Sequence, residues 1–346
     1  MKQRHLAILF VISFAVLLLA VWVSHRAQQS SASVAGTPVL PGLTAHLNAL
    51  TEVRISGADG RHVTLLKGAH RWQVKQRGYP ADSGKLRKLL IDLGDLKAVE
   101  RKTRLAADYA ALGVQSPGAA GASGVRIDLV SPAHTWSLIV GHSDGGSGAY
   151  VRRVGHKQSL LAAPLVMAEA KPAQWLSPII IDLQPQQVRS VEERVALERP
   201  YRIERAAAQD PHFRVLGVPP GRKLSGPGAA DVLASALSNL TLNDVRKALP
   251  PPRGVPLSSA VFTTFSGQSV TVSGFQTAKH GPHYIELTAR AVGPKAAQAA
   301  ARLAARVHGW QYRIPGYSYR QIFQPLSGLL QPLARHRTPA ARKPAA

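Results

Sequence analysis

The sequence contains no cysteine, and this absence excludes a disulfide framework, a thiolate zinc site and a cysteine nucleophile. Acidic residues are scarce as well. Only 19 Asp and Glu stand against 43 Lys and Arg, which gives a formal net charge of +24. Gly (29) and Pro (25) are together too few for a disordered or collagen-like chain. The 346 residues, 45% of them hydrophobic, exceed one ordinary domain. We therefore expect a folded, strongly basic protein.

One long apolar run lies near the N-terminus. It extends from Leu6 to Val23, and Ser13 is its only polar member. A helix of that length would span roughly 27 Å, close to the hydrocarbon thickness of a bilayer. A cleaved signal peptide is the alternative, but the nearest small-residue cleavage site, Ser33-Val34-Ala35, lies well beyond the run. The pattern favours an uncleaved transmembrane anchor within residues 1–27, followed by a flexible tether over residues 28–48.

The charges that flank the apolar run predict its orientation. Lys2 and Arg4 precede it, whereas Arg26 is the only fixed positive charge in the twenty residues after it. The flank with more positive charge normally stays in the cytoplasm. We therefore expect a single-pass protein of a bacterial inner membrane, held by residues 6–23, with a cytoplasmic N-terminus and a periplasmic body.

The body of the chain repeats one pattern. In a first unit over residues 49–183, alternating apolar residues broken by glycine turns predict a three-strand meander, followed by a helix that begins near Asp82. Five leucines share one face of that helix: Leu86, Leu89, Leu90, Leu93 and Leu96. Further strands are predicted over residues 125–129, 136–140 and 150–153.

A second unit over residues 184–316 replays this order. Strand-like segments are predicted at residues 188–191, 195–197, 201–203 and 213–215, a helix over 230–242, and strands at 260–265, 269–272 and 284–287. A helix over Pro294 to His308 and the segment 310–315 fall outside the repeat. Residues 317–346 form a basic C-terminal segment, with a disordered tail from about residue 331. The expected fold class is α+β: two tandem related units, each an antiparallel sheet packed with a helix, after an N-terminal transmembrane helix.

Several short segments resemble domain-of-unknown-function family 4340. They include Leu50 to Gly57, Trp72-Gln73-Val74, Tyr79 to Asp82, Ala98 to Thr103 and Tyr109 to Val114. Ile139-Val140-Gly141 and Tyr150-Val151-Arg152 match the later part of the family pattern. The resemblance implies a membrane-anchored α+β envelope protein, and some members are encoded beside ABC-type transport components like those of gliding-motility systems. It brings no catalytic residues.

Two patterns invite a catalytic or metal-site hypothesis. Gly141-His142-Ser143-Asp144-Gly145 matches the G-x-S-x-G nucleophile elbow, but Gly146-Ser147-Gly148 follows where that motif requires a helix, so a hairpin loop explains the glycines equally well. Thirteen histidines are scattered, and only His280 and His283 are near neighbours. Gly281-Pro282 between them prevents a helical ligand pair. Glu192 and Glu193 point to opposite sides of a strand. We expect no catalytic, cofactor-binding or metal-ligating residue.

The basic charge leaves two functional interpretations open. Nucleic-acid binding is not expected, because aromatic residues are only 6% of the chain and no known module is present. The first hypothesis is a non-enzymatic auxiliary or scaffold of an ABC-type envelope transport or gliding-motility-like assembly. The alternative is a binding module for an anionic envelope polymer or lipid head groups, and the charge could instead serve solubility alone. A serine hydrolase that uses Ser143 is a third, remote hypothesis.

Overall fold

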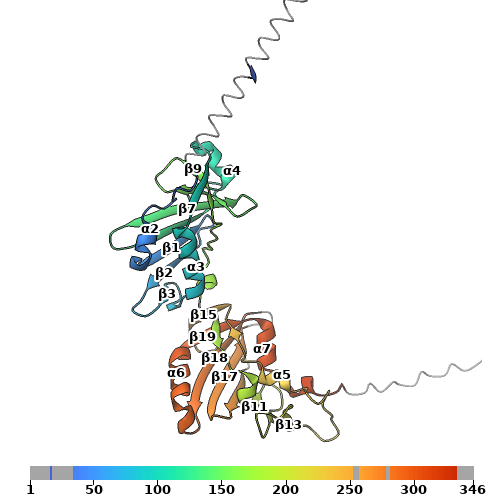
Figure 1. The fold of residues 1–346 in the computed structure, drawn as a ribbon. Coiled ribbons are helices and arrows are strands. Elements are labelled where there is room, and N and C mark those ends of the chain that lie inside the picture. The colour runs from blue at the N-terminus through green and yellow to red at the C-terminus, as the bar shows by residue number, and fades with distance from the viewer. Residues whose placement is uncertain (1–15, 18–33, 252–256, 278–280, 333–346) are drawn as a thin grey trace, which may run out of the picture. The chain divides into compact units, whose positions relative to one another are not determined.

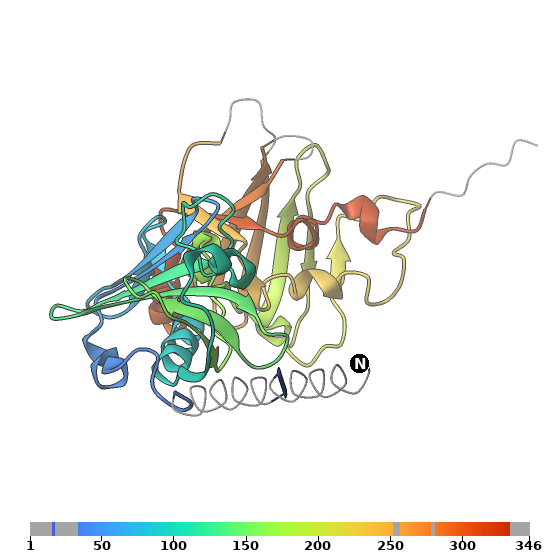
Figure 2. The ribbon, with the colours of Figure 1, turned by 90° about the horizontal axis from the view of Figure 1, so that it is seen from above.

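The computed structural model describes residues 16–17, 34–251, 257–277 and 281–332. These residues divide into two compact units, one up to Ser177 and the other from Pro178. Each unit is built around one antiparallel sheet with a few short helices, and both sheets can be followed in Figures 1 and 2. The fold is therefore α+β with a predominance of β-structure.

The first unit contains a nine-stranded sheet in the order β4-β3-β2-β1-β6-β7-β8-β9-β5. Every pairing in it is antiparallel. Inward-facing residues such as Val53, Ile55 and Leu65 are completely buried, as the alternating pattern predicts. The strands are β1 (Glu52–Gly57), β2 (His62–Lys67), β3 (Trp72–Val74), β4 (Tyr79–Pro80), β5 (Lys97–Arg101), β6 (Val125–Val130), β7 (Thr135–Ser143), β8 (Ala149–Arg153) and β9 (Ser159–Ala163).

The helix predicted near Asp82 is α3 (Ser83–Gly94). The Asp82 side chain caps it by accepting hydrogen bonds from the backbone N–H groups of Gly84 (2.9 Å) and Lys85 (3.0 Å). Its buried stripe consists of Leu86, Leu89 and Leu93, at the spacing of one helix face. The unit also contains α4 (Tyr109–Leu112) and short 3-10 turns at Leu47–Ala49, Ala106–Asp108 and Pro172–Trp175.

The tether expected over residues 28–48 is wrong for the part that the structure describes. From Val34 onward this segment is packed on the first unit, with Val39, Leu40 and Leu43 buried. The Gly36 N–H donates to the carbonyl of Ala98 (2.8 Å), and the Val39 N–H donates to that of Leu96 (2.9 Å), so the segment lies along β5. The helix α2 (Leu43–His46) follows. The apolar residues Val39, Leu40 and Leu43 decide the structure of this segment, because packing against the first unit removes their side chains from water.

The second unit contains an eight-stranded antiparallel sheet in the order β13-β12-β11-β16-β17-β18-β19-β15. A separate two-stranded ladder joins β10 to β14. Because β10 pairs inside the second unit, the boundary lies between Ser177 and Pro178 rather than between residues 183 and 184. The strands are β10 (Ile179–Ile181), β11 (Val188–Arg194), β12 (Tyr201–Glu204), β13 (Arg214–Leu216), β14 (Leu240–Thr241), β15 (Asp244–Lys247), β16 (Ser258–Thr264), β17 (Gln268–Gln276), β18 (His283–Ala291) and β19 (Trp310–Ile314).

Two local predictions for the second unit are wrong. The helix expected over residues 230–242 is reduced to α5 (Asp231–Ala234), because Leu240 and Thr241 pair with β10 instead. The strand expected at residues 195–197 is a turn in which Leu197 has a φ of 67° and is 97% exposed. In residues 235–241 the apolar spacing fits a helix as well as the turns and the short strand that the structure contains there.

The helix and the segment expected outside the repeat are built into the fold of the second unit. Helix α6 (Ala297–Val307) packs along β18, and β19 lies in the sheet between β18 and β15 (Figure 1). Helix α7 (Gly316–Ile322) and the 3-10 turn Leu326–Leu329 bury Ile322, Leu326 and Leu329, so residues 317–332 are a folded part of the second unit rather than a separate basic segment. The disorder expected from about residue 331 falls on residues 333–346, outside the described residues. Further 3-10 turns are Pro185–Gln187 and Pro294–Ala296.

The strand orders of the two sheets can be compared directly. When β4 is set aside, the first sheet reads β3-β2-β1-β6-β7-β8-β9-β5, and the second reads β13-β12-β11-β16-β17-β18-β19-β15. The two orders match strand by strand: β11 takes the position of β1, β12 that of β2, and so on through the sheet to β15, which takes the position of β5. A short helix also follows the third strand of each meander, α3 in one unit and α5 in the other.

The transmembrane helix expected over residues 6–23 lies outside the described residues, apart from Val16 and Leu17. Within the part of the chain that the structure describes, no helix is both long enough and apolar enough to cross a membrane.

Candidate functional site

The residues of the Gly141–Gly145 motif form a hairpin. Strand β7 continues through Ser143, the chain turns at Gly145 with a φ of 84°, and β8 begins at Ala149 without an intervening helix. The Ser143 hydroxyl donates to the carbonyl of Gly148 (3.3 Å) and accepts from the Gly145 N–H (3.2 Å). The Asp144 carboxylate accepts from the N–H groups of Gly146 and Gly148. Both polar side chains hold the turn, and no helix N-terminus is placed to stabilise an oxyanion.

Gly141 has a packing role of its own. A Cβ atom built at this position would collide with the backbone carbonyl of Leu112 and lie 2.9 Å from the carbonyl carbon of Gly113. These atoms belong to the turn after α4, whose close approach to β7 only glycine permits. The first glycine of the motif is thus explained by backbone packing.

The histidine beside Ser143 contacts a different serine. His142 Nε2 lies 2.9 Å from Ser123 Oγ, a pairing that sequence spacing does not suggest. Elsewhere His46, His134 and Trp136 form a ring cluster with centroid separations of 5.4–5.7 Å. Among the described residues no three His, Asp or Glu side chains could hold a metal ion together. His280 lies outside the described residues, so its pairing with His283 is not described.

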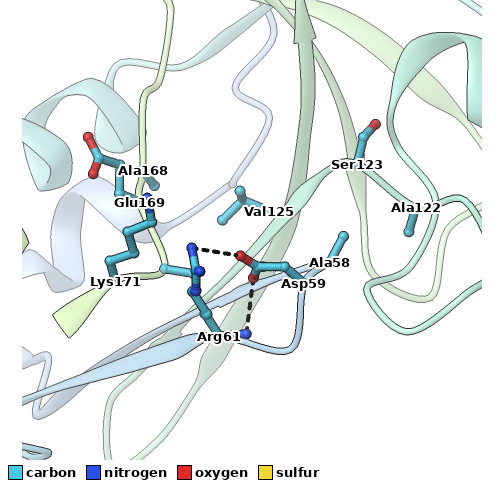
Figure 3. Close-up of a pocket in the computed structure, with 11 residues that line it drawn as sticks. Ala58, Asp59, Arg61, Ala122, Ser123, Val125, Ala168, Glu169 and Lys171 are labelled. Carbon is cyan, nitrogen blue, oxygen red and sulfur yellow. Dashed lines mark hydrogen bonds and ion pairs between the residues drawn. The ribbon is translucent and has the colours of Figure 1, made fainter.

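A pocket of about 530 Å³ opens beside the β1–β2 turn (Figure 3). Asp59 and Arg61 form an ion pair across 3.3 Å, and both side chains are more than half exposed. Glu169 and Lys171 add one charge of each sign, and Ser123 lies across the pocket from them. The charges of this pocket cancel, and solvent screens them. It offers neither a net field nor converging reactive groups.

A second pocket, of about 630 Å³, lies over β12 and β13 in the second unit. Its central cation, Arg205, donates to three backbone carbonyls, those of Val188 (3.0 Å), Pro185 (2.6 Å) and Asp210 (3.3 Å). Arg214 pairs with Glu204 at 2.7 Å. These contacts stabilise the fold locally and engage the side chains of Arg205 and Arg214 within the protein.

A third cavity, of about 450 Å³, differs from both and lies in the first unit between the β2–β3 turn and helix α3. We call it the α3 groove. Its basic lining consists of Lys67, His70, Arg71 and Arg87, with no carboxylate. Its apolar lining consists of Leu47, Trp72, Leu86, Leu90 and Ile91. A cationic rim over an apolar surface is the composition expected for a binding site that accepts an anion with an apolar portion.

Glu193 is a buried titratable group in the second unit. Its side chain is fully buried on β11, and neither carboxylate oxygen has a hydrogen-bond partner among the described residues. Burial raises its pKa to about 9, so the group is protonated at neutral pH. Its neighbour Glu192 points the other way and pairs with Arg202 at 3.0 Å, as predicted for adjacent strand residues.

Glu193 lies beside a second buried polar group. It stands opposite Tyr201 in the ladder between β11 and β12, and the Tyr201 hydroxyl donates to the carbonyl of Gln324 (2.7 Å). Burial and the charge of Glu193 both raise the pKa of Tyr201. No cavity opens onto Glu193 in the described pockets, so its chemistry concerns stability rather than a ligand.

The chain is an α+β protein, and the three described cavities do not bring together a set of reacting groups. A family model described as Domain of unknown function (DUF4340) matches residues 72–255. This match covers more than half of the 346 residues, so the chain belongs to that family. No curated protein and no solved structure matched the chain.

Proposed function

We propose that this protein is a non-enzymatic auxiliary or scaffold of an ABC-type envelope transport or gliding-motility-like assembly. In this proposal residues 6–23 anchor it in a bacterial inner membrane, and both units lie in the periplasm. The observation that carries the proposal is the junction between the apolar run and the first unit. Gly36, Thr37 and Val39 are hydrogen-bonded to Ala98 and Leu96, at the start of β5, so little more than residues 24–33 separates the run from a folded unit. Even fully extended, that segment spans about 35 Å at most.

The short junction supports a role at the membrane surface. A body held this close to the bilayer meets membrane-embedded partners by lateral diffusion and cannot search the periplasm. The matching strand orders of the two sheets support the further proposal that the units are tandem relatives, each offering an antiparallel sheet to a partner. The absence of converging reactive groups in the described pockets favours binding over catalysis.

Crosslinking in native membranes tests the proposed auxiliary role. The full chain, crosslinked in its own membranes and then purified, is expected to recover permease and ATPase subunits of an ABC-type transporter. A variant in which charged residues interrupt residues 6–23 should lose those partners, because it no longer reaches the membrane. Repeated recovery of no transport subunit from the intact chain would overturn the proposal.

A second function, binding of an anionic envelope ligand, is favoured by the α3 groove. The groove brings four basic side chains together without a carboxylate. The full chain in phosphatidylcholine nanodiscs should bind vesicles that contain an anionic phospholipid. It should release them as the salt concentration rises from about 50 mM to about 500 mM, because the Debye length falls from roughly 14 Å to roughly 4 Å and exposed charges are screened. Binding that is indifferent to salt, or equal on neutral vesicles, would eliminate this function.

A further inference from the structure

The basic side chains of the α3 groove differ from other basic side chains of the same unit in that they have no carboxylate partner among the described residues. Arg54 pairs with Glu52, Arg126 pairs with Asp128, and Lys88 pairs with Asp92 on α3 itself. Arg87, the residue next to Lys88, forms no ion pair with any residue that the structure describes. Nor do Arg71 and His70 in the β2–β3 turn form a side-chain hydrogen bond or an ion pair with another described residue. Lys67 donates to the backbone carbonyl of Asn48 (2.7 Å). The groove therefore presents cationic donors with nothing of opposite sign to neutralise them.

The local sequence explains why no acid reaches these cations. The neighbours of Arg87 on its helix face are Ser83, Leu90 and Ile91, none of which carries a charge. The two acids at the end of the helix, Asp92 and Asp95, are not among the residues that line the groove. Like charges held together without a counter-ion repel one another, and a bound anion would remove that repulsion.

The apolar lining limits the kind of anion. Ile91 is 49% exposed on α3, and Trp72 and Leu90 are each partly exposed beside it. A small inorganic anion would leave this apolar surface in water. An alkyl chain would cover it, and the gain grows with every methylene removed from water. The volume of about 450 Å³ is within the range of small-molecule sites.

We propose that the α3 groove binds a long-chain anionic amphiphile, with its phosphate or carboxylate head group at Arg71 and Arg87 and its alkyl chain along Trp72, Leu90 and Ile91. This inference rests on the second function proposed above and assigns it to named residues. The ligand chemistry could come from a bilayer phospholipid or from a free single-chain amphiphile. If residues 6–23 anchor the chain as proposed, the first unit is held near the bilayer and both sources are within its reach.

Photocrosslinking tests the site with the full chain in phosphatidylcholine nanodiscs. One arm adds an alkyl phosphate that carries a diazirine in its chain, and a second arm places a diazirine-bearing phosphatidic acid in the nanodisc bilayer. We expect labelling of the peptides that contain Trp72 and Leu90-Ile91, and the arm with the higher yield identifies the source. An uncharged alkyl alcohol with the same diazirine should label these peptides several-fold less, because it gains nothing from the cations.

Matched variants separate the groove from general surface charge. Arg71→Glu/Arg87→Glu should lower labelling by about tenfold or more, whereas Lys97→Glu/Arg101→Glu, an equal charge change on β5, should leave it within about twofold. Ile91→Gln should lower labelling several-fold, and Val99→Gln, at a residue of similar exposure (46%), should not. Because all of these side chains are exposed, unchanged melting temperatures are expected.

Three results would overturn the proposal: equal labelling by the charged and uncharged probes, yields that the groove variants do not change, or crosslinks confined to other peptides. The last two results, combined with salt-sensitive vesicle binding that survives in Arg71→Glu/Arg87→Glu, would remove the groove assignment while leaving the second function intact.

Discussion

Replacing Glu193 with glutamine should raise the stability of the second unit near neutral pH and flatten its dependence on pH. Glu193 is fully buried without a partner for either carboxylate oxygen among the described residues. Glutamine has the same shape and carries no charge at any pH, so it does not have to be protonated when the chain folds. The wild-type side chain does, because burial raises its pKa from 4.5 to about 9.

The direction of the pH effect follows from this shift. A group whose folded pKa lies above its unfolded value stabilises the fold fully only below the unfolded pKa, here 4.5. That contribution is lost progressively as the pH rises toward about 9. At pH 7 the loss amounts to about 3 kcal/mol, at roughly 1.4 kcal/mol per pH unit. Glu193→Gln should recover most of it, and this gain is large beside the usual stability of a domain.

Thermal or urea unfolding of the full chain between pH 5 and 9 measures the effect. Glu192→Gln is the matched control, because that neighbour on the same strand is 47% exposed and pairs with Arg202. The control should change stability by less than about 1 kcal/mol. If wild type and Glu193→Gln lose stability with the same slope as the pH rises, the buried carboxyl does not titrate as described.

Replacing Gly141 with alanine should destabilise the first unit by about 2–4 kcal/mol. The added methyl group would collide with the backbone carbonyl of Leu112, which has no flexible end that could move aside. Either β7 or the turn after α4 would have to shift. Unfolding of the full chain by urea, followed by circular dichroism, measures the loss.

Gly146→Ala is the matched control for Gly141→Ala. It lies in the same hairpin, and the nearest atom to its added Cβ is a carboxylate oxygen of Asp144 at 3.6 Å, an ordinary contact distance. It should cost less than about 1 kcal/mol. Equal losses at both positions would show that the hairpin is sensitive to any side chain, and the packing role of Gly141 would be wrong.

Much of the first unit was predictable because its local signals agree. The Asp82 cap, the leucine spacing of α3 and the alternating residues of β1 and β2 point to the same fold, and the strand register places their apolar residues inside. Prediction failed where one apolar pattern fits two structures. Residues 230–242 carry helical spacing, yet Leu240 finds a strand partner in β10, far from it in sequence.

The candidate site was less predictable than the fold. Arg71 and Arg87 line the same groove only because the β2–β3 turn lies against α3. Neither segment's sequence predicts that the two will be neighbours in the fold. Glu192 and Glu193 were correctly placed on opposite sides of a strand. Which of the two sides is buried depends on how the sheet is covered, and that information lies in distant segments.

The backbone hydrogen bonds between Gly36–Val39 and β5 have a mechanical consequence. If residues 6–23 hold the chain in the membrane as proposed, any tension between bilayer and body enters the first unit through these bonds, at the carbonyls of Leu96 and Ala98. The load then falls on an outer strand of the sheet before it reaches the buried core. A modest pull could therefore peel this segment away and lengthen the connection to the lipid while the nine-stranded sheet stays folded.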